Sequence, residues 1–121
     1  MSEHDHTQSL EIAARLRDAV QSLHDMAESV GTARQVKEFA AERRKNLLAR
    51  YIAKTLSNIP MSTREVIARN DSDYLKEFEE QAEQSKNAEQ AIAKFQAEQC
   101  RYEAARSLLS FSRIAFDVLQ G

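Results

Sequence analysis

Between Tyr74 and Leu119 the chain contains neither glycine nor proline, the two residues that most often end a helix. This stretch of about 46 residues is rich in Ala, Glu and Gln, so it predicts one helix roughly 70 Å long. Elsewhere only Gly31, Pro60 and Gly121 interrupt the sequence. The composition is typical of long helices and coiled coils, and we expect an all-α fold.

Apolar residues recur at alternating spacings of four and three in the N-terminal part of the chain. The stripe comprises Ile12, Leu16, Ala19, Leu23, Met26 and Val30. It predicts a helix over about residues 8–30, after a flexible segment 1–7. Gly31 is a natural helix stop, and Thr32 with Gln35 forms a capping box that would begin a new helix. The alternative is a helix that continues through Gly31 at a cost of about 1 kcal/mol.

A second helix is expected over about residues 33–57, with a wider apolar face that Arg43 interrupts. It ends before Pro60, because the residue that precedes a proline avoids helical geometry. In the connector 59–73, Ser62 and Glu65 form another capping box, which predicts one or two helical turns. Residues 70–73 then supply several candidate caps for the long helix 74–119.

These elements predict a single domain over residues 1–121. We expect either a helical hairpin or a three-to-four-helix bundle with a coiled-coil-like C-terminal helix. If the chain turns at Gly31, the long helix carries apolar residues without a local partner, and a second copy would bury them. If the chain runs straight, residues 8–58 form a rod of about the same length as the long helix. The two then form a hairpin that leaves less apolar surface for a partner to cover. The expected seam of the long helix comprises Tyr74, Phe78, Gln81, Ser85, Ala88, Ile92, Phe95, Gln99, Tyr102, Arg106, Leu109, Arg113 and Phe116.

Charge is segregated along the chain, although the formal net charge is only −2. Residues 1–30 carry −4 (two basic, six acidic), residues 31–58 carry +5 (seven basic, two acidic) and residues 74–100 carry −3 (three basic, six acidic). The basic helix could bind the phosphates of DNA or RNA. The candidate residues are Arg34, Lys37, Arg43, Arg44, Lys45 and Arg50. The alternative is that these side chains pair with acidic residues of the flanking helices.

The sequence contains no motif that predicts catalysis. It has a single Glu-x-x-His spacing, Glu3 with His6, where a carboxylate di-metal bundle site uses two, and it has no His-Glu-x-x-His, no glycine-rich phosphate loop and no nucleophile elbow. Cys100 and His24 are far apart in the sequence and would be neighbours only if the fold happened to place them side by side. The N-terminal segment Ser2-Glu3-His4 could bind Cu(II) or Ni(II), but its residues are most simply a coincidence. We therefore expect no enzyme activity, no cofactor and no metal site.

No apolar run approaches the roughly 20 residues that cross a bilayer, and residues 1–8 lack the features of a signal peptide. The single cysteine fits a reducing compartment. We expect a cytoplasmic protein that does not bind membranes.

Part of the C-terminal half has a familiar pattern. The segments Ser62-Thr63-Arg64-Glu65, Asn70-Asp71-Ser72-Asp73-Tyr74-Leu75 and Arg106-Ser107-Leu108-Leu109-Ser110-Phe111-Ser112-Arg113 are joined by the Ala/Glu/Gln-rich helix. They resemble small helical accessory proteins of bacteriophages and prophages, which are often encoded near single-strand annealing recombinases. The resemblance covers residues 61–113, and Ala105 stands where a Trp is expected. It implies a phage accessory protein that acts on DNA metabolism or on a host defence system.

Two hypotheses follow from the sequence. The first is a non-enzymatic interaction or adaptor protein that self-associates and binds a protein partner through exposed helix faces. Its expected contact residues are Tyr102, Leu109, Phe111, Arg113 and Phe116. The second is a nucleic-acid-binding accessory of phage recombination that uses the basic helix 34–54.

Overall fold

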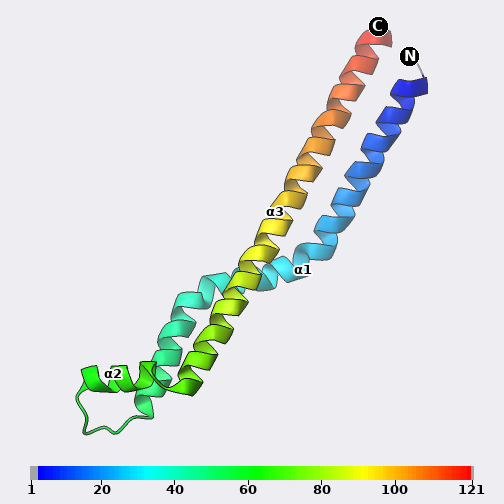
Figure 1. Cartoon of the computed structure of the whole chain (residues 1–121). Helices are drawn as coiled ribbons and strands as arrows, with labels where there is room; N and C mark the ends of the chain where they lie inside the picture. The colour runs from blue at the N-terminus through cyan, green and yellow to red at the C-terminus, as the bar shows by residue number, and fades with distance from the viewer. Residues whose placement is uncertain (1–2, 121) are drawn as a thin grey trace. The chain divides into compact units, whose positions relative to one another are not determined.

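The structure is a computed structural model that describes the backbone of residues 3–120 and the side chains of residues 7–113. Three α-helices and no strands are found in this part of the chain: α1 (Glu3–Ala53), α2 (Met61–Arg69) and α3 (Ser72–Gln120) (Figure 1). The predicted all-α fold with a long C-terminal helix is therefore confirmed. The helices contribute to two compact units. Unit 1 contains residues 1–30 and 92–121, and unit 2 contains residues 31–91.

Helix α1 continues through Gly31, so of the two alternatives the continuous helix holds, and the turn with the Thr32–Gln35 capping box does not form. Val30 and Ala33 are both buried, and residues three apart share a face only while the helix continues. Burial of this face outweighs the cost of one helical glycine, which is about 1 kcal/mol. The helix also begins at Glu3, earlier than the predicted residue 8.

The C-terminal end of α1 is held by a side chain of α2. The helix ends at Ala53, four residues before the predicted end. There Thr55 Oγ1 donates a hydrogen bond to the Ile52 carbonyl oxygen (2.6 Å). Arg64 donates from Nε to Thr55 Oγ1 (2.8 Å) and from Nη2 to the Ile52 oxygen (3.1 Å). The Ile52 carbonyl, at the end of the helix, thus accepts hydrogen bonds from the charged Arg64 side chain and from the Thr55 hydroxyl.

Helix α2 starts directly after Pro60, whose φ of −56° suits a helix start. The backbone N–H groups of Thr63 and Arg64 both donate to the Pro60 oxygen at 3.0 Å. No side chain caps this helix, so the predicted Ser62–Glu65 capping box does not form. The helix begins one residue before Ser62, which places that residue inside the first turn.

Helix α3 begins as predicted at the polar segment 70–73. Asp71 Oδ1 accepts hydrogen bonds from the backbone N–H groups of Asp73 (2.8 Å) and Tyr74 (3.2 Å). A carboxylate in this position satisfies donors of the first turn and lies at the positive end of the helix dipole. Asp71 therefore fixes where the long helix starts.

Unit 1 pairs the N-terminal part of α1 with the C-terminal part of α3 (Figure 1). Its buried apolar side chains are Ile12, Ala19, Val30 and Ala105. Ser9 Oγ and Ser112 Oγ lie 2.8 Å apart and share a hydrogen bond between the two helices. This unit is thus held by a narrow seam of mostly small or medium side chains.

The seam of α3 differs from the predicted one by one residue at its C-terminal end. Gln99, Arg106 and Arg113 were expected on it but are exposed, whereas Glu98 and Ser112 are partly buried and Ala105 is buried. An α-helix drifts by about 20° per heptad against a strict seven-residue repeat. This drift moves the buried side toward later residues, whereas the observed shift is toward earlier ones, so the position of the neighbouring part of α1 sets the seam in unit 1.

Unit 2 has a core of larger side chains. Leu47, Tyr51, Ala68 and Tyr74 are buried together, and Leu48 and Ile52 pack against them. The rings of Tyr51 and Tyr74 meet edge to face with centroids 5.6 Å apart, and the Phe78 ring lies 6.1 Å from that of Tyr74. All three helices contribute to this unit, because α2 supplies Ala68.

Candidate interaction surfaces

Five exposed apolar side chains of unit 2 lie in and beside α2. They are Leu56, Met61, Val66, Ile67 and Leu75, each at least 45% exposed, and we call them the connector surface. Helix α2 packs through Ala68, and its two large β-branched apolar residues, Val66 and Ile67, lie on other sides of the helix and face solvent. Apolar groups that gather on a surface in this way mark sites of association.

The basic residues proposed for nucleic-acid binding are all exposed on α1 of unit 2. They are Arg34, Lys37, Arg43, Arg44, Lys45 and Arg50. Some already interact within the unit: Arg50 Nη2 lies 2.6 Å from Glu77 Oε2, and the Arg44 guanidinium lies 5.8 Å from the Phe78 ring centroid. The structure thus shows both exposed cations and one of the internal ion pairs that the sequence suggested.

Tyr51 is not available to stack on a base. Its ring is buried against Tyr74, and the Lys54 Nζ atom lies 4.3 Å from the ring centroid. Burial raises the pKa of the Tyr51 phenol above 10.0, and the negative charges of Glu77, Asp73 and Asp71 add to this shift, while Arg50 opposes it. Phe39, which is 47% exposed on the same helix, is an aromatic side chain that remains accessible for stacking beside these cations.

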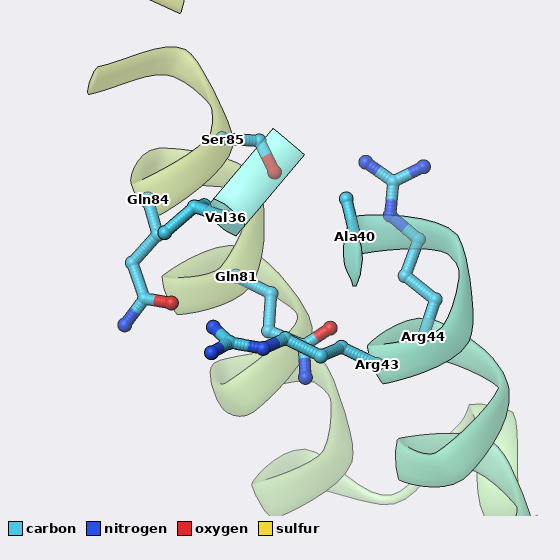
Figure 2. Close-up of a pocket in the computed structure, with 7 residues that line it drawn as sticks. All are labelled: Val36, Ala40, Arg43, Arg44, Gln81, Gln84 and Ser85. Atoms are coloured by element: carbon cyan, nitrogen blue, oxygen red, sulfur yellow. The ribbon is translucent and has the colours of Figure 1, made fainter. Parts of the chain in front are cut away.

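A polar notch interrupts the packing of α1 and α3 in unit 2 (Figure 2). Its volume is about 210 Å³ including the part open to solvent, and it is lined by Val36, Ala40, Arg43, Arg44, Gln81, Gln84 and Ser85. Figure 2 shows Arg43 extending from α1 toward the glutamines of α3, whereas Arg44 points away from them. Gln81 Oε1 is buried without a hydrogen-bond partner. The notch therefore offers hydrogen-bonding groups to water at a point where the seam lacks large apolar side chains.

The residues predicted to contact a partner separate into two groups in unit 1. Tyr102 and Leu109 are half-buried on the side of α3 that also carries the buried Ala105. Phe111 and Arg113 are exposed, and the Phe111 side chain is 72% exposed beside a shallow hollow lined by Glu103, Arg106, Ser107 and Ser110. The side chain of Phe116 lies outside the described residues. Phe111 is thus the predicted contact with the largest accessible apolar area.

Residues considered for chemistry are not gathered into a site in the described part of the chain. Cys100 and His24 are exposed, and the Ser2-Glu3-His4 segment lies outside the described side chains. Among the described residues, no three His, Cys, Asp or Glu side chains are close enough together to hold a metal ion. The described helices also include none with the length and apolar character needed to cross a membrane.

Comparison of the chain with protein-family models, with curated proteins and with solved structures finds no match.

Sequence reasoning missed the connector surface. The adjacent residues Val66 and Ile67 have no helical periodicity that indicates which side of α2 is buried. Only the burial of Ala68 shows that both face away from the core. Two consecutive β-branched residues in a short polar helix are the one local signal that could have suggested this surface.

Proposed function

We propose that the chain is a non-enzymatic interaction or adaptor protein that binds a protein partner through exposed helix faces and also self-associates. The observation that supports this proposal is the connector surface, where α2 is fixed by Ala68 and Arg64 and presents Val66 and Ile67 to solvent. The resemblance of residues 61–113 to phage accessory proteins favours a partner from the phage or from its host.

The connector surface has the features of a protein-binding site. Its apolar side chains lie on or next to a short helix that hydrogen bonds and a buried alanine hold in place, so little conformational entropy is lost on binding. Interface centres are typically apolar, and a few such side chains supply most of the binding energy. Polar residues of α2 that include Ser62 and Thr63 are exposed and could form a rim around them.

The test is a quantitative comparison of proteins bound by the wild type and by a Val66→Asp/Ile67→Asp variant, followed by direct titration of any candidate with purified proteins. Both side chains are exposed, so the variant should keep the helical circular dichroism of the wild type. Loss of either contact from an interface centre should weaken binding by about 30-fold or more.

The matched control is Asn87→Asp/Gln90→Asp, which adds the same charges to exposed positions of α3 in the same unit, away from the connector surface in sequence. It should bind like the wild type. Equal binding by all three proteins would contradict a role for the connector surface.

The second candidate function is nucleic-acid binding by the basic helix. The observation in its favour is that all six proposed cations are exposed on one helix. Titration with single- and double-stranded DNA at two salt concentrations separates the two functions, because phosphate binding by several cations weakens steeply with salt. An Arg43→Gln/Arg44→Gln/Lys45→Gln variant should then bind more weakly, whereas the connector variant should not.

A further inference from the structure

Helix α3 has a second apolar face in unit 1, separate from the seam that packs on α1. Ala97, Cys100, Ala104, Leu108 and Phe111 follow one another at spacings of three and four, so they share one side of the helix. All five are exposed, and Leu108 and Phe111 are 49% and 72% exposed. This outer face lies about a third of a turn from the buried Ala105, since successive residues are about 100° apart.

The two edges of the outer face differ in charge. Lys94 and Arg101, which lie seven residues apart, border one edge. Gln96 and Glu103, also seven apart, border the other. Arg101 already forms an ion pair with Glu98 (2.6 Å), yet its side chain remains 62% exposed. The face therefore has one basic edge and one polar to acidic edge along the same stretch of helix.

We propose that the outer face of α3 binds a second copy of this chain, with the two α3 helices parallel and in register. In a parallel pair each basic edge meets the partner's acidic edge, whereas an antiparallel pair brings like edges together. The small residues Ala97 and Ala104 let the helices approach closely, and Leu108 and Phe111 supply most of the apolar area that is buried.

This pairing specifies the self-association part of the proposed function and is independent of the connector surface. Phe111 lies in unit 1 and Val66 lies in unit 2. The two surfaces can therefore be altered separately. A failure of one proposal leaves the other to be judged by its own variants.

The first measurement is the solution mass of the full chain by light scattering at two protein concentrations. The wild type should be a dimer. Phe111→Asp should raise the dimer dissociation constant by about 30-fold or more, the effect expected of a central interface residue. Leu10→Asp is the matched control, because Leu10 is an exposed apolar residue of the same unit, on α1, and should leave the dimer intact.

Cross-linking through Cys100 reports the relative orientation of the two α3 helices, because Cys100 is the only cysteine and lies on the outer face. Mild oxidation with copper phenanthroline should link two chains through Cys100, since a disulfide needs Cα atoms within about 7 Å. Cys100→Ser/Ala104→Cys, also on the face, should link equally well. Cys100→Ser/Gln99→Cys, which moves the thiol to an exposed position off the face, should not.

A monomeric wild type would overturn the proposal, as would a dimer that Phe111→Asp leaves unchanged. A third result would overturn the parallel arrangement: a dimer that Phe111→Asp weakens, but in which the wild type links through Cys100 no better than the Cys100→Ser/Gln99→Cys control does. Circular dichroism of each variant shows whether the helices are retained.

Discussion

The two units of this molecule use the same pair of helices in different ways. In unit 2 the buried side chains include Leu47, Tyr51 and Tyr74, and α2 adds a third element to the core. Among the described side chains of unit 1, the buried ones are mostly small or medium-sized, and a serine pair joins the helices. Because apolar area removed from water sets most of the stability, unit 2 should hold the fold and unit 1 should gain more from a partner.

The largest expected effect contrasts two leucines of α1. Leu47→Ala in unit 2 should lower the free energy of unfolding by about 3 kcal/mol, because a 2% exposed side chain leaves a cavity. Leu16→Ala in the half-buried seam of unit 1 should cost about 1 kcal/mol, in line with its smaller buried area. Urea unfolding followed by circular dichroism measures both. Equal losses would show that the two units contribute alike.

The next effect concerns the hydrogen bonds that fix the connector in unit 2. Arg64→Ala removes two charged donors from Thr55 and the Ile52 carbonyl and should cost about 2 kcal/mol. Arg69→Ala, at an exposed arginine of the same helix, should change the stability by about 0.5 kcal/mol or less. The same urea experiment compares them, and a cost for Arg64→Ala no greater than for Arg69→Ala would refute the capping role.

A smaller effect is expected at the serine pair of unit 1. Ser112→Ala leaves the Ser9 hydroxyl without its partner and should cost about 0.5–1 kcal/mol, because the pair is only partly buried. Ser9→Ala/Ser112→Ala removes both hydroxyls and should be less destabilising than the single change. A double-mutant cycle measures the coupling, and purely additive losses would mean that the hydrogen bond contributes nothing.

The smallest effect is a pH dependence that belongs to unit 2 alone. The folded pKa of Tyr51 is raised above 10.0, so the folded state favours the protonated phenol. This contribution is complete below pH 10.0 and is lost as the pH rises through the folded pKa. Tyrosinate absorbance should show a late-titrating component that Tyr51→Phe removes and Tyr102→Phe leaves. Loss of that component in the Tyr102 variant instead would assign the shift to unit 1.

Several features of the fold could be predicted from the sequence because they depend on local backbone chemistry. The long C-terminal helix follows from the absence of Gly and Pro after Tyr74, and its start follows from the carboxylate of Asp71. The break before Pro60 was also predicted. Whether the helix continues through Gly31 could not be decided from the sequence, because the burial of Val30 and Ala33 depends on contacts distant in the sequence.

The candidate surfaces were predicted less well than the helices. Phe111 was predicted as a contact and is exposed, whereas Tyr102 and Leu109 are half-buried in unit 1, and the exposed apolar residues of the connector were not singled out. Apolar residues on an amphipathic helix look alike in sequence whether they pack inside the chain or bind outside it. Burial in the folded chain is what separates them.

By itself, the sequence determined the helical content, the connector and the long C-terminal helix, because propensity, capping and periodicity act within a few residues. Only the tertiary structure decided that Ala105 rather than Arg106 lies on the seam and that Val66 and Ile67 face solvent. The side of a helix that becomes buried depends on where its neighbour lies, and contacts between residues distant in the sequence decide that.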